Sequence, residues 1–388
     1  MRRLTFALSL LASPAIAQDC GGDFQSFLAG VKVEAVAQGL DSGAADSFLA
    51  GAARDPAVIK ADRSQGVFQK DFISFSRALI SQNRMDNGQI YGDRNDATFD
   101  QIETTFGIPR EVILAFWAFE TDFGQVQGNF NTRNALVTLA HDCRRPELFL
   151  PQVYAAIALT ERGDFDPVNT TGAWAGEIGQ VQMLPGDIIE SGMDGDGDGQ
   201  VDLKGSSADA LMSGANVLSG LGWRPDEPWL QEITVPGDLP WADTGLDKPK
   251  TVAEWATLGV NARSGSLPNP ALVARVLLPM GRNGPAFLAY PNFDVYFEWN
   301  KSFVYVTTAA YFATRLAGAP PYNAGNPSPP LSGETMQALQ TKLEGLGHDV
   351  GGIDGILGAK TRAAVQIEQS RLGLPADAWP TQELLNRL

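Results

Sequence analysis

Histidine is nearly absent from this sequence, since the 388 residues include only two. A Ser-His-Asp triad needs histidine as its base, and most catalytic zinc sites need it as a ligand. The composition therefore argues against both kinds of chemistry.

Basic residues and long apolar runs are also scarce. There are 29 basic and 45 acidic residues, which gives a formal net charge of −16. Such a surface repels nucleic acid and anionic membranes, but it does not repel a largely neutral polymer such as a polysaccharide. Beyond the N-terminus, no stretch is long and apolar enough for a membrane helix. We therefore expect neither a nucleic-acid partner nor a membrane span.

The N-terminus has the features of a secretory signal peptide. Two arginines precede an apolar stretch, residues 4–12, which is too short to span a bilayer, and a small-x-small cleavage site ends at Ala17. An N-terminal anchor helix is the alternative, and the shortness of the stretch argues against it. Lipidation of Cys20 is not expected, because Gln18 and Asp19 stand where small apolar residues would be needed. Cleavage of the signal peptide, residues 1–17, would leave a soluble, periplasmic protein.

Cysteine is as rare as histidine, with only Cys20 and Cys143 present. In an oxidising compartment, two cysteines favour one disulfide, which would tie the mature N-terminus to the segment near residue 143. Two free, buried thiols are the alternative.

Proline, by contrast, is concentrated in one place. The segment APPYNAGNPSPPL, residues 319–331, contains five prolines and reads as a stiff, polar linker. It would separate a main domain, residues 20–318, from a C-terminal module, residues 332–388.

The main domain is expected to be mainly helical. Apolar periodicity predicts helices at 132–140, 147–162, 206–220 and 302–316. Short β-rich segments bounded by Pro, Gly and Asn occur at 231–235, 275–278, 286–289 and 293–297, and they predict a small inserted sheet. The fold class is therefore mainly α (α+β).

A further helix is expected from Pro109, in its first turn, to Gly124 as its cap. It is apolar on all sides, which is typical of a helix in the centre of a domain. Glu120 lies near its end among aromatic residues (Phe116, Trp117, Phe119 and Phe123). Such surroundings disfavour a charged carboxylate and raise its pKa toward that of a general acid. A solvated glutamate at the end of a helix is the alternative.

An acidic loop follows at residues 194–202 with the sequence DGDGDGQVD. Alternating carboxylates around a glycine match an EF-hand-type calcium loop, because calcium prefers several oxygen ligands. The predicted ligands are Asp194, Asp196, Asp198, Gln200, Asp202 and Asp209. Asp209 is included because Gly205 occupies the twelfth position, which normally carries Glu. A solvated acidic turn would not explain the alternation. We expect a structural calcium ion and no organic cofactor.

A glycine-rich block at residues 172–185 has the sequence GAWAGEIGQVQMLP. Small residues allow close approach of the backbone, and Gln182 offers both a donor and an acceptor to a ligand. The alternative is a plain loop between helices. Glu177 is a possible second carboxylate, but nothing in the sequence pairs it with Glu120.

These segments, in this order, resemble the lytic murein transglycosylase B family, whose core is lysozyme-like. Residues 120–124 (ETDFG) resemble the family's E-[ST]-x-[FWY]-G motif, and 176–185 match its G-x-x-G-x-x-Q-F-M-P block. Residues 131–136 and 144–149 resemble the two segments between these motifs. Residues 299–302 (WNKS) resemble the family's Y-N-x-S segment.

The resemblance implies that Glu120 is the catalytic acid/base. It also implies that the sugar-binding residues are Gln182, Asn300, Arg144, Arg145 and Trp174. Three positions in the main domain depart from the family. Ala173 replaces a common Ser, Met183 replaces the Phe of the Q-F-M-P block, and Trp299 replaces Tyr, so that any hydroxyl role there would be lost. The C-terminal module resembles the small three-helix peptidoglycan-binding domain, with Glu368 in place of its usual apolar residue.

The resemblance further implies cleavage of peptidoglycan glycan strands between N-acetylmuramic acid and N-acetylglucosamine, with formation of 1,6-anhydromuramoyl ends. This lyase-type reaction needs only one catalytic carboxylate, whereas most glycosidases use two. Two alternatives remain open: a hydrolytic muramidase on the same scaffold, and a non-catalytic peptidoglycan-binding protein.

Overall fold

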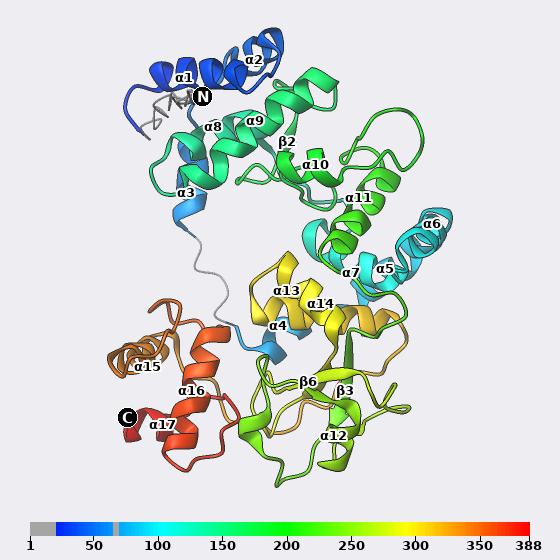
Figure 1. Ribbon diagram of the computed structural model, residues 1–388, viewed down its shortest axis with the longest axis vertical. Coiled ribbons are helices and arrows are strands. Elements are labelled where there is room, and N and C mark those ends of the chain that lie inside the picture. Colours follow the sequence, from blue (N-terminus) through cyan, green and yellow to red (C-terminus); the bar gives the residue numbers. More distant parts are fainter. Residues whose placement is uncertain (1–20, 65–69) are drawn as a thin grey trace, which may run out of the picture.

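A computed structural model describes residues 21–64 and 70–388 and shows a mainly helical protein with a small five-stranded sheet and a two-stranded pair (Figure 1). The predicted fold class is confirmed. The expected signal peptide and Cys20 lie outside the described residues. Within these ranges, no helix combines the length and the apolar composition needed to cross a membrane.

The N-terminal part of the main domain is a helical layer with its own apolar core. It contains α1 (Phe24–Ala37), α2 (Ser42–Leu49), α3 (Pro56–Arg63), α8 (Thr132–His141), α9 (Pro146–Arg162) and α10 (Pro185–Ser191). The first three helices each begin after an aspartate whose side chain accepts a hydrogen bond from a backbone amide of the first turn. These caps satisfy donors that a helix start leaves unpaired, so the local sequence determines where each helix begins.

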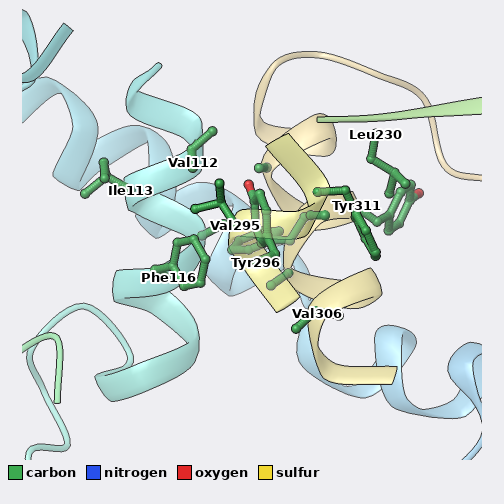
Figure 2. Packing of buried hydrophobic residues seen from close by; sticks show 14 of the residues in the cluster. Val112, Ile113, Phe116, Leu230, Val295, Tyr296, Val306 and Tyr311 are labelled. Carbon is green, nitrogen blue, oxygen red and sulfur yellow. The ribbon is translucent and has the colours of Figure 1, made fainter. Parts of the chain in front are cut away.

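A second and larger core surrounds α7 (Arg110–Thr121). It is built with α4 (Phe72–Leu79), α5 (Gln82–Arg94), α6 (Asp96–Phe106), α11 (Ser207–Gly220), α13 (Pro291–Trp299) and α14 (Phe303–Leu316). Every residue of α7 from Val112 to Ala118 is buried, as expected for a helix that is apolar on all sides. Figure 2 shows Phe116 of α7 beside Tyr296 of α13, and their stacked rings lie 4.8 Å apart.

The end of α7 differs from the sequence prediction. Pro109 is the N-cap rather than part of the first turn, and the C-cap is Asp122 rather than Gly124. Asp122 and Phe123 both adopt left-handed backbone conformations, with φ of 52° and 60°. Such conformations are unfavourable for residues other than glycine, and here tertiary contacts hold them. The Arg84 side chain donates a 2.9 Å hydrogen bond to Asp122, and the Phe123 ring is buried.

The sheet is antiparallel with strand order β4-β6-β7-β3-β5. Its strands are β3 (Leu230–Thr234), β4 (Lys250–Thr251), β5 (Asn261–Ala262), β6 (Val273–Leu277) and β7 (Ala286–Ala289). Between them lie η1 (Trp241–Asp243) and α12 (Val252–Thr257). A separate two-stranded pair joins β1 (Phe130–Asn131) to β2 (Thr171–Gly172).

The four predicted helices and three of the four predicted β segments are confirmed, but the fourth segment is wrong. Residues 293–297 belong to helix α13, not to a strand. Pro291 starts this helix, and its buried residues include Phe293 and Tyr296, which are three positions apart. The aromatic composition suggested a strand, but the spacing of the buried residues is helical.

The C-terminal module consists of α15 (Gly333–Gly345), α16 (Ala359–Arg371) and α17 (Gln382–Arg387), and it lies beside the sheet region (Figure 1). Arg362 of α16 is buried at the junction and donates hydrogen bonds to the carbonyl oxygens of Leu278 and Pro279, at 3.5 and 2.7 Å. Its guanidinium group also lies against the rings of Phe303 and Trp379. The module is therefore docked on the main domain.

The proline-rich segment is itself packed rather than free. The hydroxyl groups of Tyr322 and Ser76 are 2.9 Å apart, and the amide of Asn326 donates to the carbonyl of Asn283 at 2.8 Å. The segment thus follows the surface of the main domain.

Candidate active site

Glu120 lies in the last turn of α7, where its side chain meets two residues that are distant in the sequence. Its Oε1 atom accepts a 3.0 Å hydrogen bond from the indole Nε1 of Trp299 and a 2.6 Å hydrogen bond from the hydroxyl of Tyr305. Trp299 ends α13, and Tyr305 lies in the first turn of α14. Three helices therefore converge on this carboxyl group.

The hydroxyl group beside Glu120 comes from a residue that the sequence did not single out. Trp299 stands where the family has a tyrosine, so position 299 itself offers no hydroxyl. The Trp299 indole donates to Glu120, and Tyr305 supplies a hydroxyl from the next helix. Ser302 caps α14, and its amide donates to Asn300 Oδ1 at 2.8 Å, so a short turn brings Tyr305 back toward Glu120.

Aromatic stacking orients the donors. The centroid of the Phe116 ring lies 4.7 Å from that of Trp299. Phe119 stacks on Phe312 at 5.2 Å and makes an edge-to-face contact with Tyr305. Such ring contacts add to the apolar burial and fix the orientation of the side chains. The aromatic residues around Glu120 thus hold its hydrogen-bond donors as well as exclude water.

The environment of Glu120 favours its neutral form. Burial raises the pKa of the Glu120 carboxyl, and the hydrogen bonds from Tyr305 and Trp299 offset part of this rise. Because Oε1 accepts both hydrogen bonds, the acidic proton is left to Oε2. Burial and the charge of Glu120 raise the pKa of Tyr305 well above its ordinary value, so Tyr305 remains a donor.

The glycine-rich block is joined to the end of α7. The Thr121 hydroxyl donates a 2.5 Å hydrogen bond to the carbonyl of Gln180, and a bridge pairs Ile178 with Met183. Gln182 has a positive φ of 54°, and its side-chain amide donates to the carbonyl of Gly179 at 2.8 Å. The backbone of this loop therefore fixes the Gln182 side chain.

Arg144 and Arg145 share a partner that the sequence did not reveal. Both guanidinium groups are ion-paired with the carboxylate of Asp62, on α3, which is 2% exposed. Arg145 also lies over the ring of Phe149, and its Nε is buried without a hydrogen-bond partner in the described part of the chain. Asp62 lies more than 80 positions away from the arginines, so no local sequence pattern predicts this ion pairing.

The two remaining predicted sugar-binding residues, Asn300 and Trp174, do not contact Glu120 through a described hydrogen bond. Asn300 is the C-cap of α13, next to Trp299, and its side chain accepts a hydrogen bond from the Ser302 amide. Trp174 is partly buried and packs against the N-terminal core.

The acidic loop gathers three of its predicted ligands. Carboxylate oxygens of Asp194, Asp196 and Asp209 all lie within 4.8 Å of one another. Asp209 is buried, and it accepts hydrogen bonds from the amides of Gly195, Asp196 and Asp202. The other predicted ligands, Asp198, Gln200 and Asp202, are exposed on the same loop. Proximity of three carboxylates in this way creates repulsion that a cation would relieve.

Comparisons with known proteins identify the families of both parts of the chain. The family model described as the transglycosylase SLT domain matches residues 23–314, and that of a peptidoglycan binding domain matches residues 332–388. The membrane-bound lytic murein transglycosylase B of Escherichia coli (strain K12) is 24% identical over 232 residues, which is 60% of this chain. The chain covers 63% of the length of that relative.

Solved structures extend the similarity over both domains. The crystal structure of SltB3 from Pseudomonas aeruginosa in complex with NAG-anhNAM-pentapeptide is 34% identical, with a TM-score of 0.87 over 95% of this chain and 99% of that chain. The Escherichia coli lytic transglycosylase Slt35 in complex with calcium has a TM-score of 0.66 at 23% identity, over 78% of this chain and 97% of that chain.

Proposed function

This chain belongs to the family of transglycosylases with an SLT domain, and from that premise we propose that it cleaves peptidoglycan between N-acetylmuramic acid and N-acetylglucosamine, forming 1,6-anhydromuramoyl ends. The observation that carries the proposal is the Glu120 carboxyl, whose pKa is raised by burial and which is oriented by two hydrogen bonds on one oxygen. The complex of SltB3 with an anhydro-muramoyl ligand supports the product class.

In the proposed reaction, Glu120 acts first as an acid and then as a base. Its Oε2 gives a proton to the glycosidic oxygen, and the bond to C1 of the muramoyl residue breaks while the substrate's N-acetyl group stabilises the cationic centre. The carboxylate then removes the proton of the C6 hydroxyl, whose oxygen closes on C1. Trp299 and Tyr305 stabilise the intermediate carboxylate, because both donate hydrogen bonds to Oε1.

Around Glu120, we assign the sugar-binding role to Gln182, Asn300, Arg144, Arg145 and Trp174. Arg145 is partly exposed, and its Nε has no hydrogen-bond partner among the described residues, so its guanidinium group retains a donor for a sugar or peptide oxygen. The C-terminal module would add a second contact with peptidoglycan, and residues 319–331 connect it to the main domain, residues 20–318.

Product analysis tests the proposal. Purified cell-wall sacculi are incubated with the protein, and the released muropeptides are analysed by liquid chromatography and mass spectrometry. We expect anhydromuramoyl ends, which are 18 Da (one water) lighter than reducing ends. Reducing ends would instead support the hydrolytic muramidase, and binding to sacculi without release would support a non-catalytic binding protein.

We also propose that the acidic loop binds a structural calcium ion. Asp194, Asp196 and Asp209 would hold it, with Asp198, Gln200 and Asp202 as further ligands from the same loop. The glycines at 197 and 199 have positive φ, the left-handed conformation that lets the loop turn between its aspartates. The calcium complex of the related Slt35 structure supports the choice of metal.

Calcium is expected to raise the melting temperature, since it binds the folded state selectively. At a free concentration 100 times the dissociation constant, the stabilisation is about 2.7 kcal/mol, or roughly 5 °C. Differential scanning calorimetry of the metal-free protein with calcium or magnesium would measure it. The variant Asp196→Asn should lose most of the shift, and the absence of any shift at millimolar calcium would contradict the assignment.

Finally, we propose export to the periplasm, with cleavage after Ala17 and a disulfide between Cys20 and Cys143. Gly21 supports the disulfide, because its amide donates a 2.8 Å hydrogen bond to the carbonyl of His141, and a Cβ built on Gly21 would lie 3.3 Å from the Cys143 sulfur. The residue after Cys20 therefore already lies beside Cys143.

Thiol titration of the denatured exported protein is expected to find no free thiol before reduction and two after it, one for each cysteine. N-terminal sequencing of the same sample would identify the cleavage site. Two reactive thiols in the unreduced protein would rule out the disulfide.

A further inference from the structure

Arg362 of the C-terminal module contacts the main domain at the start of α14, close along the chain to the donors of Glu120. Its guanidinium carbon lies 4.5 Å from the centre of the Phe303 ring. Arg362 is 7% exposed, and Phe303, the first residue of α14, is buried as well. Burying a charge is costly unless hydrogen bonds compensate it, and a module attached only by its linker would avoid that cost.

Several contacts hold Arg362 in this position. The carbonyl oxygens of Leu278 and Pro279 accept its hydrogen bonds, and the Trp379 ring lies 5.7 Å from its guanidinium carbon. Trp379 is buried and belongs to the core that surrounds α7. A Cβ on Gly281 would lie 2.6 Å from the Cβ of Trp379, so the two chain segments are in close contact. The module and the main domain therefore share one apolar core at this junction.

Phe303 connects the two helices that carry the donors of Glu120. It begins α14, and its ring centroid lies 6.5 Å from that of Phe297 in α13. Trp299 follows Phe297 by two positions at the end of α13. Tyr305 follows Phe303 by two positions in α14. A displacement of the Phe303 ring would therefore disturb the ends of both helices.

The turn between these helices is held by its own hydrogen bonds. The Ser302 amide donates to Asn300 Oδ1 at 2.8 Å, the Ser302 hydroxyl accepts from the Tyr305 amide at 3.4 Å, and the Ser302 carbonyl accepts from the Val306 amide at 2.9 Å. The Tyr305 hydroxyl then donates its 2.6 Å hydrogen bond to Glu120. A movement at the start of α14 would thus be passed on to this donor.

We propose that the docked C-terminal module completes the active site, with Arg362 as a positioning residue that acts through Phe303 on the donors of Glu120. The proposal rests on the acid/base role proposed for Glu120. Hydrogen bonds weaken steeply when their geometry is lost, and a misplacement of about 1 Å in a catalytic group can cost about a hundred-fold in rate. The module would therefore increase the rate of cleavage in addition to binding peptidoglycan.

The first test measures kcat and KM separately on a soluble tetrasaccharide of alternating N-acetylglucosamine and N-acetylmuramic acid, which removes any advantage of binding to the insoluble wall. Arg362→Ala should lower kcat by about ten- to a hundred-fold and leave KM almost unchanged. Arg362→Lys should recover most of the rate, because its ammonium group can still lie over the Phe303 ring. An unchanged kcat in Arg362→Ala, or a rise in KM alone, would overturn the proposal.

A second variant keeps the module docked. Phe303→Leu removes the ring that connects Arg362 to α13 but leaves the hydrogen bonds of Arg362 to Leu278 and Pro279. Small-angle X-ray scattering should show a compact protein, circular dichroism a folded one, and kcat should fall as in Arg362→Ala. The control is Lys360→Ala, whose exposed side chain lies on the same helix, and which should keep the wild-type kcat. A folded, compact Phe303→Leu protein with the wild-type kcat would exclude this route.

The last test needs no activity, so it separates this proposal from the proposed function. Nitrogen-15 NMR of the full-length protein, labelled at its eight tryptophans, follows the indole N–H of Trp299, which is identified by its loss in Trp299→Phe. Glu120→Ala removes the acceptor and gives the position of the signal without this hydrogen bond. In Arg362→Ala, the Trp299 signal should move toward that position. An unchanged signal would reject the positioning role, even if the wild-type protein released no muropeptide.

Discussion

Replacement of Glu120 by glutamine is expected to lower the rate of muropeptide release by about a thousand-fold or more, because removing a general acid/base typically costs 10²–10⁴. Glutamine has the same shape and can still accept the hydrogen bonds of Trp299 and Tyr305 through its oxygen. What it lacks is the proton that Oε2 donates and later recovers. The rate of anhydromuropeptide release from sacculi, measured by mass spectrometry, checks this expectation.

A matched control is Glu298→Gln, which removes an exposed carboxylate one position before Trp299. Its activity should remain close to that of the wild type. If Glu120→Gln retained the wild-type rate, the catalytic assignment would fail, whatever the products.

The difference in stability between Glu120→Gln and the wild type should depend on pH. Burial raises the pKa of Glu120 in the folded state, so the folded protein loses stability as pH rises through the unfolded value, about 4.3, toward the raised folded value. Glutamine does not ionise. Glu120→Gln should therefore melt at a higher temperature than the wild type at pH 7, and this advantage should disappear near pH 3. Such a result would also show that lost activity does not reflect unfolding.

Replacement of Arg362 by alanine is expected to release the C-terminal module from the main domain. The guanidinium group is buried, donates to the carbonyl oxygens of Leu278 and Pro279, and lies against the rings of Phe303 and Trp379. Burial lowers the pKa of Arg362 to about 9, so it remains charged at neutral pH. Loss of these contacts at a buried charged group should weaken docking by about 3–5 kcal/mol.

Small-angle X-ray scattering would detect release of the module as a larger radius of gyration. Limited proteolysis would detect it as faster cleavage within residues 323–331. The control is Lys360→Ala, two positions earlier on α16, whose exposed ammonium group is paired with Asp349 of the same module. A compact Arg362→Ala protein with an intact linker would show that other contacts dominate the junction.

Local sequence signals determined much of this protein. The buried helix before Glu120, the aspartate caps and the alternating acidic loop all depend on residues that are near one another in the chain, so their spacing alone reveals them. For the same reason the sequence singled out Glu120 as an acid with a raised pKa. It failed at residues 293–297, where an aromatic run fits either a strand or a helix and only packing against α14 decides.

The partners of Glu120 were decided by the tertiary structure alone. Trp299 and Tyr305 lie 179 and 185 positions away from it, and Asp62 lies about 80 positions before the arginines that it binds. Propensity and periodicity describe neighbours along the chain, whereas a pKa depends on neighbours in space. The sequence therefore pointed to Glu120, and the fold supplied the two donors that orient its carboxyl group.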